Sequence, residues 1–349
     1  MAKSTLIETI ENEFGIDYIG FLQEIDEPAN YMGSRFLPAK NEFDYDWVYH
    51  IFDNTVAMAK LMSRGDAEAP VIGGPAVKKV AGSVAPFGQK FDVNKNILNK
   101  IFNPRNDNEL KSNLRQILDE SARNVRSAQA RREWLRFQVC GKGSVTIAND
   151  DDDTVLTVDF GVPSGHKIAS SALEGDEWDS SNTPKPLSDI IAACETFYDT
   201  NKMMPDAIVM RRAQLKQLTG SNEVATEFSD NATRISLSII NDYLISLGYP
   251  TIETYDEFVR TLDSDGRPTT SEYLVPAGRI LFLKEAAGQE IEDTGRLIMG
   301  PVAENDFQPG IFTNIYEETD PKKYWHFMKT EMWPAVYNPE YVLYMDVLE

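Results

Sequence analysis

Histidine and cysteine are the side chains that would carry metal-ligand or nucleophilic chemistry here, and both are rare in this chain. The three histidines, His50, His166 and His326, lie far apart, and no HExxH pattern brings two of them to one helix face. The two cysteines, Cys140 and Cys194, form no CxxC pair, which excludes a four-thiolate zinc site and a disulfide scaffold. Their spacing favours structural roles, with both cysteines as buried, reduced thiols.

Two short segments resemble ligand-binding loops in composition but not in spacing. The acidic run at 149–153 has neither the central glycine nor the distal glutamate of a calcium-binding loop, so we predict a solvated turn. The segment at 161–167, GVPSGHK, has one residue too few between its glycines for a phosphate-binding loop and contains a proline. Because carboxylates are abundant along the whole chain, no pair of them stands out as an acid and a base. The sequence therefore predicts no catalytic residue, no metal site and no cofactor.

The composition is that of a folded protein with a strongly acidic surface. The chain has 349 residues, 42% of them hydrophobic and 26% charged, which suffices for a large core in one or two domains. Its formal net charge of −21 disfavours binding to nucleic acid across the bulk of the surface. The N-terminal stretch is interrupted by Glu8, Glu11 and Glu13 and lacks the apolar run of a signal peptide, and no other run approaches the ~20 residues that span a bilayer. We therefore expect no membrane association, and synthesis in a reducing cytosol.

A long amphipathic helix is the strongest local prediction. Asn106 and Glu109 have the spacing of a capping box, and Gly141 ends the pattern. Between them, apolar residues recur every three or four positions over 110–139. A helix over 107–139 would be about 50 Å long and indicates a thin, elongated subunit. The opposite face carries Lys111, Arg115, Glu120, Arg123, Arg126 and Arg131.

Residues 63–92 are rich in glycine and proline, which excludes a helix over this segment. Its apolar residues are too numerous for a solvated linker. We therefore predict an extended two-stranded arm that bends near Gly73, Gly74 and Pro75 and packs on another molecule. Each limb would reach about 40 Å.

The remaining elements follow the long helix. Residues 144–148 and 154–160 are predicted to form a hairpin, and residues 185–300 a separate α/β unit. The tail is predicted to alternate strands and turns, with its aromatic residues buried by neighbouring copies: Trp325, Trp333 and Tyr337. A thin subunit, an apolar arm and the absence of chemistry together suggest a protein that forms a lattice.

Short pieces from about residue 35 to the end have the order and spacing of a known family. They lie at 36–38, 63–65, 87–91, 141–142, 158–161, 186–190, 273–276, 279–282, 320–321 and 341–347, together with Trp178, Pro334 and Pro339. In this pattern the chain resembles the major capsid proteins of tailed bacteriophages, in particular the phage lambda capsid protein E family. That family has the HK-ninety-seven capsid fold.

The resemblance implies an α+β, HK-ninety-seven-like fold with five parts. These are an N-terminal arm and the start of a peripheral domain (1–62), an extended loop (63–92), the peripheral domain with its spine helix (93–184), an axial domain (185–310) and a return to the peripheral domain (311–349). The extended loop would lie over an adjacent subunit. Its candidate contact residues are Arg64, Asp66, Val71, Ile72, Lys78, Lys79, Phe87 and Lys90.

The function that the resemblance implies is that of a major capsid protein and not of an enzyme. The chain would assemble with itself into hexamers and pentamers of an icosahedral shell around double-stranded DNA, without sequence-specific binding. Its further partners would be a portal and, because no coiled-coil extension is fused to the chain, a separate scaffolding protein; a decoration protein is left open. The protein would reside in the virion after assembly in the host cytoplasm.

Two alternative functions stay open at this point. One keeps the fold and changes the role, to the shell protein of a cellular nanocompartment similar to an encapsulin. The other is an acidic cytosolic hydrolase whose carboxylates form an unrecognised site. Neighbouring genes for a terminase, a portal and a scaffold would separate the capsid from the nanocompartment.

Overall fold

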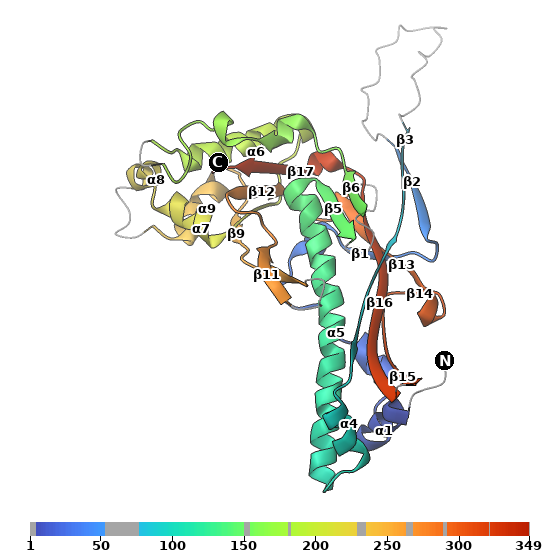
Figure 1. Ribbon diagram of the computed structural model, residues 1–349. Helices are drawn as coiled ribbons and strands as arrows, with labels where there is room; N and C mark the ends of the chain where they lie inside the picture. Colours follow the sequence, from blue (N-terminus) through green and yellow to red (C-terminus); the bar gives the residue numbers. More distant parts are fainter. Residues whose placement is uncertain are drawn as a thin grey trace, which may run out of the picture.

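The computed structural model describes residues 5–52, 77–149, 154–180, 183–228, 235–262, 268–288, 292–320 and 322–348. The subunit is thin and elongated: a long helix, α5 (Asp107–Lys142), runs along a narrow body toward a wider unit of helices and strands (Figure 1). The α+β fold class predicted from the sequence is confirmed.

Helix α5 confirms the predicted long helix and ends at Lys142 rather than at 139. Its 36 residues span about 54 Å. Asn106 Oδ1 accepts a hydrogen bond from the Glu109 backbone N–H at 2.8 Å, which satisfies one of the free amides of the first turn. At the other end, Gly143 adopts φ 66°, the left-handed conformation that ends helices and that residues with a Cβ rarely adopt.

The body is built on a six-stranded sheet beside α5. Its central strand, β16 (Lys322–Val336), pairs antiparallel with β4 (Ala85–Asp92) along one edge and with β13 (Gly295–Val302) and β15 (Ile311–Thr319) along the other. Two short strands, β1 (Ala39–Asn41) and β14 (Gln308–Pro309), pair with β13. Apolar side chains of α5 and of this sheet form one continuous core.

Three short helices cover the start of α5 and strand β15. They are α1 (Thr5–Phe14), α2 (Tyr18–Gln23) and α4 (Lys95–Phe102), and their apolar faces share a second core. Helix α1 contributes Leu6, Ile7 and Ile10, all of them buried, to this core. Helix α3 (Gly33–Phe36) lies farther along α5.

The wider unit at the end of α5 holds a five-stranded sheet covered by helices. The strand order is β7 (Lys167–Ile168), β17 (Val342–Asp346), β12 (Arg279–Leu283), β8 (Ala207–Met210) and β9 (Ile252–Thr254). The helices are α6 (Pro186–Asn201), α7 (Arg212–Thr219), α8 (Asn222–Glu227) and α9 (Leu237–Ser246). Their apolar side chains form a third core. Two hairpins, β5 (Ser144–Asn149) with β6 (Thr154–Asp159) and β10 (Phe258–Leu262) with β11 (Pro268–Tyr273), flank α5.

The division into parts differs from the prediction at two strands. Strand β13 was expected within the axial unit, but it pairs with β16 in the body. Strand β17 was expected to return to the body, but it pairs with β12 in the wider unit over five residue pairs. The chain therefore passes from the wider unit to the body and back again before it ends.

The aromatic tail is also placed differently from the expectation. Trp333 and Tyr337 are 6% and 2% exposed within the chain's own core, so no neighbouring copy is needed to cover them. The reason is that the second half of β16 has partner strands and packed side chains on both sides, and its residues 330–336 are all buried. Trp325, near the start of the strand, is only half-buried.

Candidate assembly surfaces

A two-stranded hairpin projects from the body next to the C-terminal end of α5. Strand β2 (Asp46–Phe52) pairs antiparallel with β3 (Val77–Ser83), from Asp46 opposite Ser83 to Phe52 opposite Val77. Figure 1 shows this hairpin leaving the body as a narrow extension, and we call it the arm. Val48, on one limb of the arm, is 49% exposed. An isolated two-stranded hairpin is at best marginally stable in water, so such an arm gains stability from a partner surface.

The structure brings only part of the predicted contact set together. Lys78 and Lys79 lie in β3, opposite Ile51 and His50. Phe87 and Lys90 lie in β4 and pair with Thr330 and Phe327 of the body sheet. The other four predicted residues, Arg64, Asp66, Val71 and Ile72, lie outside the described residues.

The limbs of the arm therefore differ from the two limbs expected within 63–92. They are residues 46–52 and 77–83, and residues 85–92 belong to the body. The physical reason is that residues 77–92 run on as nearly one extended segment that changes its pairing partner at Val84. The Val84 N–H still bonds the Tyr45 carbonyl at 3.0 Å, and beyond it the strand pairs with β16.

The base of the arm is anchored by Trp47. A Cβ at Gly82, the residue opposite Trp47, would lie 2.5 Å from the indole ring, so only glycine lets the ring lie across β3. Trp47 is 7% exposed and belongs to the core of the body. Next to it lies a hollow of about 630 Å³, and Val84, Phe160 and Trp333 are among its apolar lining residues. The arm thus leaves the body from a fixed, apolar base.

A buried group of charges joins α5 to the chain segment before β1. Glu133 and Arg136 have side chains that are 0% and 1% exposed and form an ion pair at 3.3 Å. Glu133 Oε1 accepts hydrogen bonds from the Gly33 N–H at 2.9 Å and from the Tyr255 hydroxyl at 2.6 Å. Arg136 Nε donates to the Leu37 carbonyl at 2.9 Å. Because these groups are hydrogen-bonded, the cluster fixes two parts of the chain, the segment 33–37 and Tyr255, to one turn of α5.

The same segment is tied down at two further points. Glu27 accepts from Arg136 and Arg132 at 2.9 and 3.1 Å. Burial raises the pKa of Glu27, but the two arginines outweigh burial and leave the pKa below its ordinary value. Arg35 forms ion pairs with Glu253 and Glu285 of the wider unit, and these hydrogen bonds raise the pKa of its guanidinium. The segment 27–37 therefore bridges the body and the wider unit.

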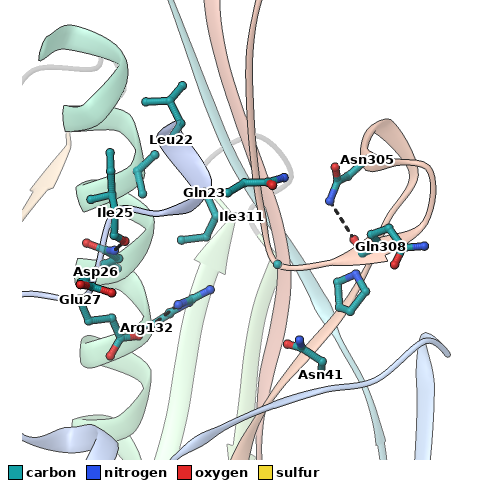
Figure 2. Close-up of a pocket in the computed structure, with 14 residues that line it drawn as sticks. Leu22, Gln23, Ile25, Asp26, Glu27, Asn41, Arg132, Asn305, Gln308 and Ile311 are labelled. Carbon is teal, nitrogen blue, oxygen red and sulfur yellow. Dashed lines mark hydrogen bonds and ion pairs between the residues drawn. The ribbon is translucent and has the colours of Figure 1, made fainter. Parts of the chain in front are cut away.

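A polar hollow of about 560 Å³ lies beside this segment, between α5 and the sheet. Figure 2 shows the Glu27–Arg132 ion pair on one side of the hollow and the Asn305–Gln308 hydrogen bond on the other. Its lining residues carry amides, carboxylates, apolar groups and one arginine, but no histidine, cysteine, serine or lysine. The lining therefore contains no nucleophile next to a base.

One buried cluster has the residue types of a catalytic triad. Ser121 Oγ lies 3.0 Å from His326 Nδ1, and His326 Nε2 lies 3.6 Å from Glu120 Oε2. Both Ser121 and His326 are 0% exposed, so no substrate can reach the hydroxyl. Ser121 Oγ also accepts from the Tyr18 hydroxyl and donates to the Ile117 carbonyl, and the imidazole stacks on Phe91. The cluster holds α2, α5 and β16 together and does not form a reaction site.

The remaining cysteine and histidine residues considered in the sequence have the following surroundings. Cys140 and Cys194 are free and buried, as predicted, and burial raises the pKa of the Cys194 thiol to about 12. His166 is buried, with Nδ1 3.2 Å from the Val342 carbonyl. Within the part of the chain that the structure describes, no three side chains of the metal-binding types gather at one point. In the same part, no helix is long and apolar enough to cross a membrane.

Three solved structures that share this fold are described as capsid proteins. A prophage capsid protein from E. coli CFT073 aligns with a TM-score of 0.60 at 13% identity and covers 99% of both chains. The capsid of Myoviridae phage XM1 aligns at 0.54 and 9% identity, with 93% of this chain and 94% of that chain covered. The capsid of Ralstonia phage GP4 aligns at 0.50 and 12% identity, covering 93% of both chains. At identities this low, the structural agreement shows the HK-ninety-seven-like fold and not a shared function.

The family follows from the sequence itself. No curated protein matches the chain. The family model of phage major capsid protein E, however, matches residues 19–347, which is nearly the whole chain. The chain therefore belongs to the phage major capsid protein E family, and it is a structural subunit of a phage head that assembles with copies of itself into a shell.

Proposed function

We propose that the chain builds its shell from hexamers and pentamers, and that the arm of each subunit lies over a neighbouring copy. The observation that carries this proposal is the arm itself. It is an antiparallel ladder on a fixed apolar base, and Val48 on this ladder is 49% exposed, so a partner surface would bury apolar area there and stabilise the arm. A neighbouring copy is the partner that a capsid subunit always has.

The partners beyond the shell follow from the role of a head. A portal occupies one vertex, a separate scaffolding protein acts during assembly in the host cytoplasm, and the finished shell encloses double-stranded DNA. The chain performs no catalysis. Its net charge of −21 keeps phosphate from binding tightly to the wall, so DNA is enclosed without sequence-specific contacts and moves freely during packaging.

Shortening the arm tests the proposal. Val48 and Ala81 face each other in the ladder, so residues 49–80 are replaced by a two-residue Asn-Gly turn, which suits a hairpin. The full chain and the shortened chain are each expressed with the neighbouring head genes. We expect closed shells from the full chain, and from the shortened chain a folded subunit with an unchanged circular dichroism spectrum and no shells.

Two results would contradict the proposal. Shells of normal size from the shortened chain would show that the arm makes no essential contact. Unfolding of the shortened subunit would show that the arm packs within its own chain. Shells that form without any DNA or portal, and that instead enclose an enzyme, would support the nanocompartment over the phage head.

A further inference from the structure

An arginine of the long helix is held between two aromatic rings. The Arg131 guanidinium carbon lies 4.7 Å from the centre of the Phe87 ring in β4 and 4.2 Å from the centre of the Trp134 ring, one turn farther along α5. Stacking on two rings fixes the guanidinium plane and leaves only its edge for hydrogen bonds. The N–H donors of the Arg131 guanidinium are therefore held in a fixed orientation.

This guanidinium has no acceptor within the described chain. Arg131 Nε is buried and has no hydrogen-bond partner, and no ion pair of Arg131 is formed by the residues that the structure describes. Glu272 is the acidic group whose charge acts on Arg131, but its two oxygens accept from Trp134 Nε1 at 3.2 Å and from Lys142 Nζ at 3.3 Å.

The neighbouring arginines of the same helix differ in this respect. Arg132 is partly buried and Arg136 is fully buried, and both are paired with Glu27. For Arg131, desolvation lowers the pKa to about 10, against the opposing effect of Glu272, and the side chain stays charged at neutral pH. A desolvated cation without an acceptor costs free energy in the isolated subunit, and an arriving anion would recover it.

We infer that Arg131, held between Phe87 and Trp134, is a receptor for a carboxylate of a second copy of this chain. The inference rests on the proposed assembly. Charge favours this occupant, because the chain has 55 acidic and 34 basic side chains and a neighbouring copy presents mainly carboxylates. Arginine binds a carboxylate through two parallel hydrogen bonds, and the stacked rings remove most of the entropy cost of ordering its side chain.

A phosphate of enclosed nucleic acid is the competing occupant. A charge of −21 repels a polyanion from the surface as a whole, whereas a single carboxylate of a docked neighbour arrives with the many other contacts of the shell. The observations therefore favour the second copy.

The test is Arg131→Met in the full chain, with Arg126→Met as the matched control. Methionine keeps the apolar contact with both rings and removes the charge. Arg126 lies on the same helix and is exposed, so its replacement changes the net charge equally. Subunits are compared by thermal unfolding before assembly, and the subunit concentration needed for shells is measured by light scattering and negative-stain electron microscopy.

We expect Arg131→Met to leave the unfolding temperature of the subunit unchanged or higher and to raise the concentration needed for shells at least tenfold. Arg126→Met should assemble like the wild type, and Arg131→Lys should lie between the two, because it keeps the charge and loses the forked donors. A variant that keeps the stability of the subunit but assembles less readily distinguishes a receptor for a neighbouring copy from an arginine that only stabilises the fold.

Three results would overturn the inference. Assembly of Arg131→Met at the wild-type concentration would exclude an essential contact. A clear loss of subunit stability would make Arg131 a structural residue. Normal shells of Arg131→Met that no longer retain DNA would show that Arg131 binds a phosphate of the nucleic acid. If the wild-type chain itself forms no shells, the proposed function is wrong, and the inference about Arg131, which rests on it, is wrong as well.

Discussion

Replacing Arg136 by methionine tests whether the buried charges hold the segment 27–37 against α5. Arg136 is 1% exposed, and the change removes its hydrogen bond to the Leu37 carbonyl and its ion pairs with Glu27 and Glu133. Glu133, at 0% exposure, loses its only cationic partner among the described residues. Removal of one partner of a buried ion pair costs about 3–5 kcal/mol, because the remaining charge has no water to solvate it.

The assay is urea unfolding of the unassembled subunit, followed by tryptophan fluorescence. A loss of about 3–5 kcal/mol is a large share of a typical stability of about 5–15 kcal/mol. Adding Glu133→Gln to Arg136→Met should recover part of the loss. The reason is that the amide oxygen can still accept from the Gly33 N–H and the Tyr255 hydroxyl without an unpaired charge. Arg126→Met serves as the exposed control.

Either of two results would contradict this role of the buried charges. A cost below about 1 kcal/mol for Arg136→Met, the range of exposed ion pairs, would mean that water reaches the cluster. A double variant less stable than Arg136→Met alone would mean that the charge of Glu133 is stabilised by something other than Arg136.

Three further predictions concern the helix, the acid stability and the thiols. Ala128→Pro, at a position 1% exposed in the middle of α5, should cost about 3 kcal/mol or more and abolish shells; normal particles by electron microscopy would contradict a rigid spine. Because the folded-state pKa of Glu27 lies below its ordinary 4.5, its ion pairs stabilise the subunit above that pH and are lost as the pH falls through the folded-state value. The stability difference between wild type and Glu27→Gln should therefore shrink below about pH 4.5 in urea titrations, and a constant difference would show that the pairs do not form. Cys140 and Cys194 should react with a thiol reagent only after unfolding, and fast reaction of the native subunit would contradict their burial.

Local sequence signals predicted the elements whose partners are close in the chain. Helix α5 follows from its capping residues and apolar repeat, and α6 begins at Pro186, at the start of the predicted α/β unit. The strand pairing was harder to predict, because the paired strands are far apart in the chain. Strands β2 and β3 are separated by 24 residues, and β4 and β16 by more than 200. The composition of a strand does not determine which strand it pairs with, so the sequence alone places residues 85–92 in a limb of the arm.

The assembly surfaces were predicted only in outline. The charged pattern of α5 suggested a solvated face for Arg131, whereas the ring of Phe87, brought by β4, covers it. The buried pair Glu133 and Arg136 was missed, although one signal was available. Both charges lie within 133–141, a stretch of otherwise largely apolar residues that is buried on all sides of the helix. Charges inside such a run need partners, and only the fold shows that the partners come from 27–37.

Cryo-electron microscopy of particles from cells that express the full chain with its neighbouring head genes tests the central claim most directly. We predict closed icosahedral shells in which hexamers and pentamers of this chain can be traced, with α5 as an unbroken rod in each subunit and the arm in contact with a neighbouring copy. Only dispersed, folded subunits under these conditions, or shells whose density does not fit this chain, would contradict it.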